Sequence, residues 1–128
     1  MREILFRGKR TDNKQWIYGF YALIGKENPN AYIITNNGRK IRVCHRSIGQ
    51  YTGITDVNSK KIFEGDIVDE YNSLGKLKAK GTIVTWDNLF SGWRLEENQS
   101  MFGGGIVANY KVIGNIHDNP ELLKGGRQ

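Results

Sequence analysis

IGQYTGITDVNSKKIFEGDIV, residues 48–68, is the stretch of sequence that decides the fold. Two short apolar runs of strand-forming residues flank the polar segment TDVNSK, residues 55–60. Gly53 and the pair Gly65–Asp66 stand where strands begin or change direction, because glycine adopts backbone angles that other residues avoid and aspartate bonds nearby backbone amides. The stretch therefore predicts strand, turn and strand, with Gly53, Gly65 and Asp66 as structural turn residues.

Similar short runs, separated by turn residues, recur along the whole chain. They predict strands at residues 4–6, 15–24, 31–35, 39–48, 48–54, 61–71, 78–88, 91–97 and 107–116. Asn37–Gly38 is a strong hairpin signal between two of these runs. Helical periodicity is weak, and only residues 120–123 could form a helical turn, with Pro120 at its first position and Asp118 or Asn119 as its cap. The pattern is typical of a mainly antiparallel β protein, either a small barrel or paired sheets.

The run at residues 15–24 carries apolar groups on both faces of its expected strand. Trp16, Tyr18 and Phe20 share one face, while Ile17 and Tyr21 share the other, because side chains alternate along a strand. A strand with two apolar faces is typical of a central position in a sheet.

Composition indicates a single globular domain, or two very small units that share a core, in 128 residues. Cys44 is the only cysteine, so the chain forms no internal disulfide, as is usual in a reducing cytoplasm. No apolar run approaches the roughly 18–20 residues that a membrane helix needs, and the N-terminus lacks a secretion signal. We therefore expect a soluble cytoplasmic protein with no membrane partner.

The positive charge is concentrated in the first half of the sequence. Residues 1–50 contain ten Lys and Arg against three acids, a net charge of +7, whereas residues 51–128 contain nine against ten, a net of −1. Such asymmetry favours an anionic partner, nucleic acid first. The alternative is a basic surface that only keeps the protein soluble.

No complete catalytic, cofactor or metal site is visible in the sequence. Cys44 and His45 are neighbours on an expected strand and point to opposite faces, and His117 lies in a turn, so neither a nucleophile–base pair nor a zinc site is predicted. The acidic residues Glu64, Asp66, Asp69 and Glu70 fit a strand entrance better than a magnesium site. Gly103–Gly105 lacks the lysine and the helix of a phosphate-binding loop. We expect no cofactor.

Two rows of basic residues are the candidate contacts for nucleic acid. One row is Lys40, Arg42 and Arg46, with Cys44 between the two arginines; the other is Lys76, Lys78 and Lys80. Residues at every second position share one face of a strand, so each row could follow a phosphate backbone while nearby aromatic rings stack on bases. Lysines on edge strands also block aggregation between sheets, and this structural alternative stays open.

Three segments resemble the YopX family, small proteins of phages and prophages. They are REILFRGKRTDNKQWIYG at 2–19, QYTGITDVNSKKIFEGDIV at 50–68 and VIGNIHDNPELL at 112–123. The resemblance implies a compact antiparallel β fold with an SH3-like barrel element, and it carries over no catalytic residue. One departure is Asn58–Ser59, where the family tends to have Asn-Gly, so this turn is expected to differ in type or to carry mild strain.

The resemblance gives a domain layout and leaves two functional hypotheses. The layout is one β domain at 1–119, with an N-terminal subdomain at 1–49 packed on a barrel at 50–119, and a C-terminal tail at 120–128. The first hypothesis is a non-enzymatic accessory protein that binds an unknown host or phage protein through exposed aromatics such as Trp86, Phe90 or Trp93. The second is a nucleic-acid-binding accessory protein that uses the basic first half. Self-association through edge strands is compatible with both.

Overall fold

Ten strands and two 3₁₀ helices make up the described part of the computed structural model, which comprises residues 3–88, 91–95 and 109–123. The strand pairs are antiparallel, so the mainly antiparallel β class predicted from the sequence is confirmed. The chain divides into two compact units, Met1–Tyr51 and Thr52–Gln128. Within the described residues, no helix is long and apolar enough to cross a membrane.

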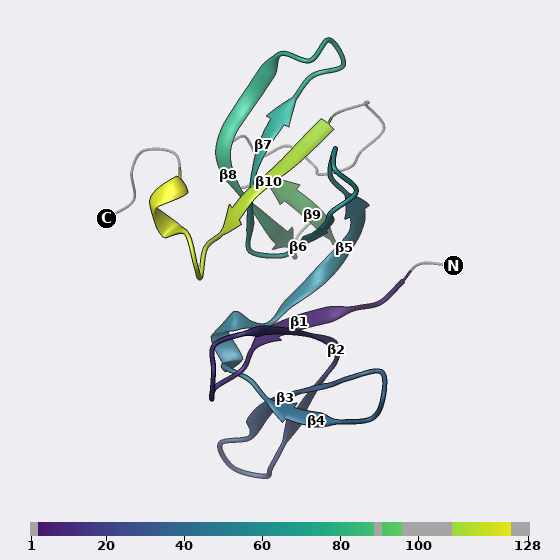
Figure 1. The fold of residues 1–128 in the computed structure, drawn as a ribbon, viewed down its shortest axis with the longest axis vertical. Coiled ribbons are helices and arrows are strands. Elements are labelled where there is room, and N and C mark those ends of the chain that lie inside the picture. The colour runs from purple at the N-terminus through teal and green to yellow at the C-terminus, as the bar shows by residue number, and fades with distance from the viewer. Residues whose placement is uncertain (1–2, 89–90, 96–108, 124–128) are drawn as a thin grey trace. The chain divides into compact units, whose positions relative to one another are not determined.

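The N-terminal unit is a sheet followed by a short helix, and the beginning of a fifth strand completes it (Figure 1). Its elements are β1 (Phe6–Lys9), β2 (Trp16–Ile24), β3 (Asn30–Ile34), β4 (Lys40–Arg42), η1 (His45–Ser47) and the first residues of β5 (Gly49–Thr55). The strand order of the sheet is β4-β3-β2-β1-β5-β6, in which β5 is the strand that continues into the C-terminal unit.

β2 is central in this sheet, as its two apolar faces predict. Its first residues pair with β1, from Trp16 opposite Lys9 to Gly19 opposite Phe6. Its later residues pair with β3, beginning with Phe20 opposite Ile34. The predicted Asn37–Gly38 hairpin follows β3, and the amide of Gly38 donates to the carbonyl of Thr35 at 2.9 Å.

One face of the sheet supplies the core of the N-terminal unit. Its buried residues are Ala31, Ile33 and Val43, and the half-buried Phe6, Ile17, Tyr21 and Ile48 pack against them. Ile17 and Tyr21 belong to the alternate positions of β2, so Trp16, Tyr18 and Phe20 are directed to the opposite face.

Two predicted strands of this unit are wrong in their bounds. The first strand was expected at residues 4–6 but runs from Phe6 to Lys9. It continues past Phe6 because the polar Arg7 and Lys9 pair with β2, and Arg7 also lies opposite Gly49 of β5. The strand expected over 39–48 ends at Arg42 and gives way to η1. The Ser47 hydroxyl donates to the Cys44 carbonyl at 2.6 Å and accepts from the amide of Lys9 at 2.8 Å, and these bonds hold the chain in a turn.

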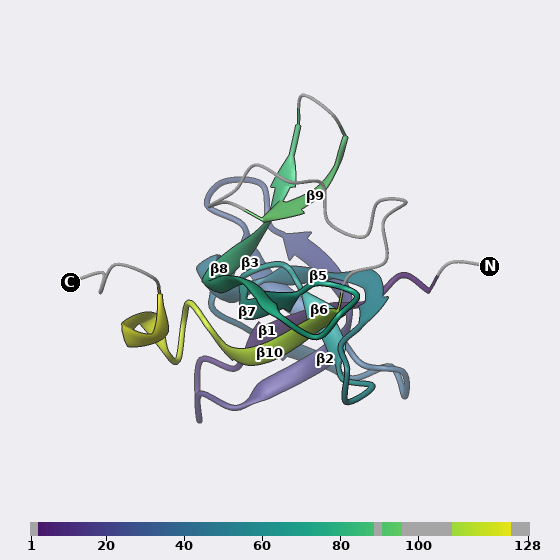
Figure 2. The same cartoon turned by 90° about the horizontal axis from the view of Figure 1, so that it is seen from above.

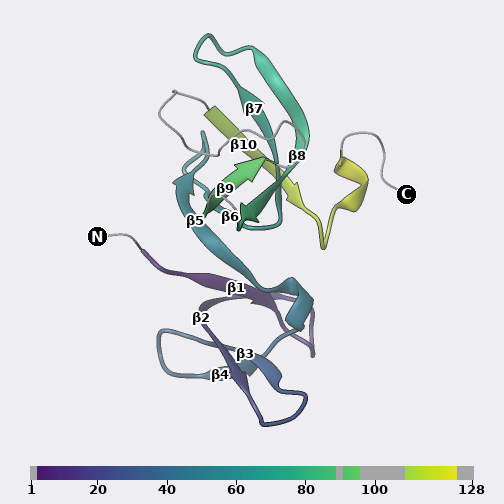
Figure 3. The ribbon, with the colours of Figure 1, turned by 180° about the vertical axis from the view of Figure 1, so that it is seen from behind.

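The C-terminal unit contains the rest of β5 and a four-stranded sheet, whose back view is given in Figure 3. The further elements are β6 (Lys61–Phe63), β7 (Asp66–Tyr71), β8 (Leu77–Asp87), β9 (Gly92–Leu95), β10 (Asn109–Asn115) and η2 (Pro120–Leu122). The sheet order is β10-β7-β8-β9. β8 pairs with β7 up to Ile83 and with β9 from Val84, and in Figure 2 this second half turns away from β7 into the β9 hairpin.

Two apolar clusters stabilise the C-terminal unit. The larger buries Ile62, Val68, Val84, Leu95 and Tyr110. The smaller buries Ile67, Ile83 and Leu123, so the chain after η2 is anchored by a buried side chain at the start of the expected tail. η2 lies at the predicted helical turn, but its cap residue, Asn119, makes no side-chain cap hydrogen bond.

The expected SH3-like barrel does not close in the part of the chain that the structure describes. The strands form two sheets instead. Gly103–Gly105, Phe90 and the end of the tail at 124–128 lie outside the described residues.

Residues 48–68 form strand, turn and strand, with a second sharp turn before β7. Ser59 lies in the first turn with a positive φ of 64°, the left-handed conformation that glycine would adopt at lower cost. Gly65 forms the second turn with a φ of 90°. Asp66 is 1% exposed, and its carboxylate accepts a hydrogen bond from the amide of Phe63 at 2.7 Å. Gly53 has a φ of 89° inside β5 and nothing within 4 Å of the position of a Cβ.

Asp56 joins the first turn to β10 through one carboxylate. It accepts hydrogen bonds from the amides of Asn58 at 2.8 Å, Lys60 at 2.9 Å and Val112 at 3.0 Å. Burial by itself would raise the pKa of this carboxyl, but these amide donors hold it below its usual range. The ionised carboxylate therefore stabilises the folded unit.

Replacing Gly65 with alanine should destabilise the protein by about 1–2 kcal/mol, because a side chain strains a left-handed backbone. The nearest neighbours of an added Cβ, His117 and Ile116, lie at 3.7 Å, so backbone strain and not a clash causes the loss. Gly65→Val should cost more, since a branched side chain tolerates this conformation less well. Thermal unfolding checks both variants, and melting temperatures equal to that of the wild type would contradict the assignment.

Stability should fall at acid pH as Asp56 becomes protonated. Because the pKa of Asp56 is lower in the folded state, its contribution is complete above about pH 4, the ordinary value of an aspartate, and is lost as the pH falls through the folded-state pKa. Urea unfolding over an acid pH series measures the loss. Asp56→Asn should lower stability at neutral pH by about 1–3 kcal/mol, because one amide oxygen cannot replace both carboxylate oxygens. A pH dependence that is the same in this variant would contradict the role of Asp56.

Candidate nucleic-acid interface

The face of the N-terminal sheet opposite its core carries aromatic and basic side chains together. Strand register places eight of them on this face, here called the aromatic–basic face: Arg7, Lys9, Trp16, Tyr18, Phe20, Tyr32, Lys40 and Arg42. Cross-strand partners lie on the same side of a sheet, as do residues two apart on one strand. The face therefore extends from β1 through β2 and β3 to β4.

Exposed rings lie along β2 on the aromatic–basic face. Phe20 is 59% exposed and Tyr18 is 48% exposed, which is high for large apolar side chains. Trp16 is half-buried and already has a cationic partner, because the guanidinium carbon of Arg7 lies 4.5 Å from its ring centroid. The Nζ of Lys9 lies 5.8 Å from the same ring. Tyr18 and Phe20 are therefore the rings most accessible to a ligand.

Exposed cations lie on the neighbouring edge, on β4. The Nζ of Lys40 lies 5.0 Å from the ring centroid of Tyr32, and the guanidinium of Arg42 donates to the Asn30 side chain at 3.0 Å. Register places Lys40 opposite Ile34, which is itself opposite Phe20. Strands β1 to β4 contain no aspartate or glutamate, so the side chains of these strands give the face a single sign of charge.

A groove of about 460 Å³ opens beside the exposed rings. Tyr18 and Phe20 line it together with Ile4 and Leu5 from the chain before β1, and Glu3 and Asn36 are its charged and polar lining residues. This volume lies within the range of small-ligand sites. The groove can therefore receive one flat group against an aromatic wall.

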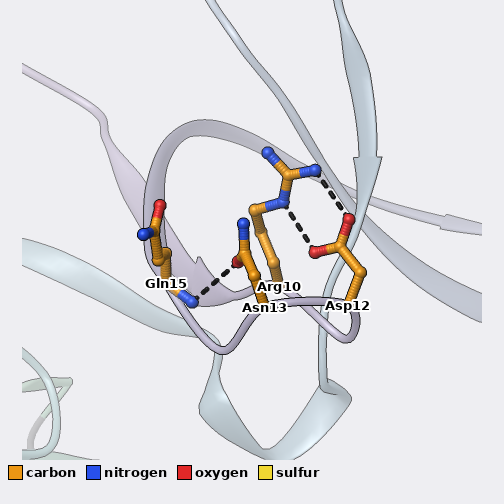
Figure 4. Close-up of polar contacts among 4 residues, drawn as sticks. All are labelled: Arg10, Asp12, Asn13 and Gln15. Carbon is orange, nitrogen blue, oxygen red and sulfur yellow. Dashed lines mark hydrogen bonds and ion pairs between the residues drawn. The ribbon is translucent and has the colours of Figure 1, made fainter.

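Asp12, in the turn between β1 and β2, is neutralised by Arg10. The guanidinium of Arg10 donates to both carboxylate oxygens, at 2.9 Å and 2.7 Å (Figure 4). This hydrogen bonding lowers the pKa of Asp12 and raises that of Arg10. In the same turn the Asn13 side chain accepts from the amide of Gln15 at 2.9 Å. The ion pair leaves little net negative charge in this turn.

The structure divides the first predicted basic row. Lys40 and Arg42 share β4 and its exposed face, but Arg46 lies on η1 after the strand has ended. The row of three on one strand is therefore wrong, and two of its members remain together. Cys44, between the two arginines, is exposed, and its amide donates to the carbonyl of Lys9 at 2.8 Å.

The second predicted row lies in the C-terminal unit, away from the aromatic–basic face. Lys78 and Lys80 are exposed on β8, and Lys76 is exposed in the turn before it. The partner strand β7 contains Asp69, which accepts a hydrogen bond from the amide of Gly81 at 2.9 Å, and Glu70, which is buried opposite Ala79. Since side chains alternate along a strand, Lys78 and Lys80 lie on the face opposite Ala79 and Glu70.

The aromatic anchors proposed from the sequence also lie in the C-terminal unit. Trp86 and Trp93 are cross-strand partners with ring centroids 5.0 Å apart in an edge-to-face arrangement. Trp93 packs against the larger core cluster, so only Trp86, at 43% exposure, presents much surface. His45 contacts the Tyr21 hydroxyl at 3.5 Å, and His117 lies in a turn.

Sequence reasoning missed the combination of rings and cations on one face. The alternation of Trp16, Tyr18 and Phe20 was a visible signal, and the Asn37–Gly38 hairpin implied that β3 and β4 lie side by side. The missing information was the pairing of β2 with β3, which connects the two signals across the sheet.

Comparisons with known proteins identify the family. The crystal structure of protein EF1440 from Enterococcus faecalis has a similar fold, with a TM-score of 0.63 and 24% sequence identity over 97% of this chain and 100% of that chain. A search of curated proteins finds no match. The YopX protein family matches residues 5–124, which is nearly the whole chain. The resemblance of the three sequence segments is therefore confirmed, and the chain belongs to the YopX family.

Proposed function

We propose that the protein is a non-enzymatic accessory protein that binds nucleic acid through its aromatic–basic face. The observation that carries this proposal is the presence of exposed rings and exposed cations on one sheet face whose strands contain no acid. Cations bind phosphates irrespective of sequence, and aromatic rings bind bases through their flat faces. The N-terminal unit also accounts for the excess positive charge of the chain.

The cellular setting of this function is proposed from the family. The family resembled by this sequence consists of small proteins of phages and prophages, which supports an accessory role in the cytoplasm of a bacterial host. The single cysteine supports the same compartment.

Binding of a host or phage protein is a second candidate function, favoured by the groove. Its apolar lining includes Ile4, which is 52% exposed, as well as Phe20. A partner peptide could place an apolar anchor there. This function needs the groove but not the cations, so Ile4→Ser should weaken it while substitutions of Lys40 and Arg42 should not.

Two variants with equal loss of charge test the nucleic-acid function. Lys40→Ala/Arg42→Ala removes two cations from the aromatic–basic face, and Lys78→Ala/Lys80→Ala removes two from the C-terminal unit. Fluorescence anisotropy with a labelled oligonucleotide over a salt series should give a plot of log affinity against log salt that is flatter by about 1.4–1.8 for the first variant, the contribution of two phosphate contacts. The second variant should keep the wild-type slope, because its cations lie outside the aromatic–basic face.

The control variant, Lys78→Ala/Lys80→Ala, shows whether the position of the lost cations matters or only their number. Both variants lower the net charge by the same amount, so a general effect of charge would weaken them equally. Equal weakening, or no binding of any oligonucleotide by the wild type at low salt, would refute the proposed interface.

A further inference from the structure

We infer that the aromatic–basic face binds single-stranded nucleic acid, with a base stacked on Phe20 and the phosphates on Lys40 and Arg42. This inference rests on the proposed function and adds the form of the nucleic acid and the role of each side chain. Its basis is the combination of a ring that is 59% exposed, a groove beside that ring, and two exposed cations on the edge strand.

The spacing of the exposed rings excludes the bases of a stacked duplex. Tyr18 and Phe20 are two residues apart on β2, which separates their side chains by about 6.7 Å along the strand. Adjacent bases of a duplex are about 3.4 Å apart and are covered on both faces by their neighbours. Only a single strand can separate its bases far enough for each of them to contact a ring.

The charges around the groove determine the direction in which a nucleotide would lie. Glu3 lines the groove with the N-terminal chain, and its carboxylate repels phosphate. Lys40 lies across β3 from Phe20, two strand spacings or about 10 Å away, and attracts phosphate. If a base lies in the groove and its sugar–phosphate backbone lies toward β4, the phosphate is near Lys40 and away from Glu3.

Asn36 supplies a polar group beside the ring. It lines the groove at the turn after β3, and an asparagine side chain offers both a donor and an acceptor. Such a group can meet the hydrogen-bonding edge of a base, while Phe20 contacts the face of that base. This is the arrangement by which sheets bind unpaired bases through aromatic side chains.

A direct test compares a fluorescein-labelled oligothymidylate, which does not pair with itself, with a duplex of equal length. The wild type should bind the single strand more tightly. Phe20→Ala should weaken single-strand binding by about five- to 150-fold, the usual effect of losing one stacked ring, and should leave duplex binding unchanged. Lys40→Ala/Arg42→Ala should weaken both, since phosphates are present in both.

Substitutions that change only the ring separate stacking from apolar contact. Phe20→Leu keeps an apolar side chain without a π face and should behave like Phe20→Ala, whereas Phe20→Trp should bind as well as the wild type. Thermal unfolding verifies that each variant is folded. If Phe20→Ala does not fold, Tyr18→Leu serves as a second variant that removes an exposed ring from the same face.

Each contrary result has a separate meaning. Equal affinity for single strand and duplex, or full single-strand binding by Phe20→Leu, would overturn the stacking inference while leaving nucleic-acid binding intact. No binding of either probe would overturn the proposed function itself. If light scattering shows a dimer that Phe20→Ala dissociates while oligonucleotide binding is unaffected, the face belongs to a second copy of the chain and the inference is wrong.

Discussion

The pairing of β2 with two different neighbours is the constraint on which the N-terminal sheet depends. The strand changes partners between Gly19, which faces β1, and Phe20, which faces β3. A Cβ at position 19 would overlap the carbonyl oxygen of Ile34 and lie 2.9 Å from its carbonyl carbon, so the close approach of β3 requires glycine. Since a slip of one residue exchanges the two faces of a strand, the register that directs Ile17 into the core also directs Phe20 outward.

The exposure of Phe20 forgoes free energy that burial of its ring would contribute to folding. Burying a phenylalanine side chain is worth roughly 1.5–3 kcal/mol relative to leaving it in water, and Phe20 forgoes most of that. Single exposed apolar residues are ordinary, but Phe20 adjoins Tyr18 and a groove that Ile4 also lines. Contiguous apolar surface with polar residues at its edge usually marks an interaction site. The cations on β4 support the proposal that the ligand is an anion with flat apolar groups.

The sequence predicted what depends on neighbours along the chain and missed what depends on distant ones. Alternation in residues 16–21 gave the faces of β2 and its central position, and Asn37–Gly38 gave a hairpin. The end of β4 at Arg42 was not predictable, because it depends on a hydrogen bond between Ser47 and the amide of Lys9, 38 residues away. The polar residues after Phe6 form part of β1 because they pair with β2 and, at Arg7, with Gly49 of β5. The sequence showed the aromatic residues of β2 and the basic residues of β4 separately. Only the pairing of the strands in the sheet shows that they lie on one face.

The stretch that identifies the family and the face proposed to bind a ligand contain different residues. Asp56 and Asp66, within residues 48–68, direct their carboxylates to backbone amides, so these charges stabilise turns. Their role follows from burial, which makes an unpaired carboxylate costly. Phe20, Lys40 and Arg42 are exposed, and the fold tolerates change at such positions. The protein EF1440 shares this fold at 24% identity, and a shared fold does not carry over what is bound. Family membership transfers the architecture, whereas the residues proposed to bind a ligand, at positions 18, 20, 40 and 42, lie outside residues 48–68.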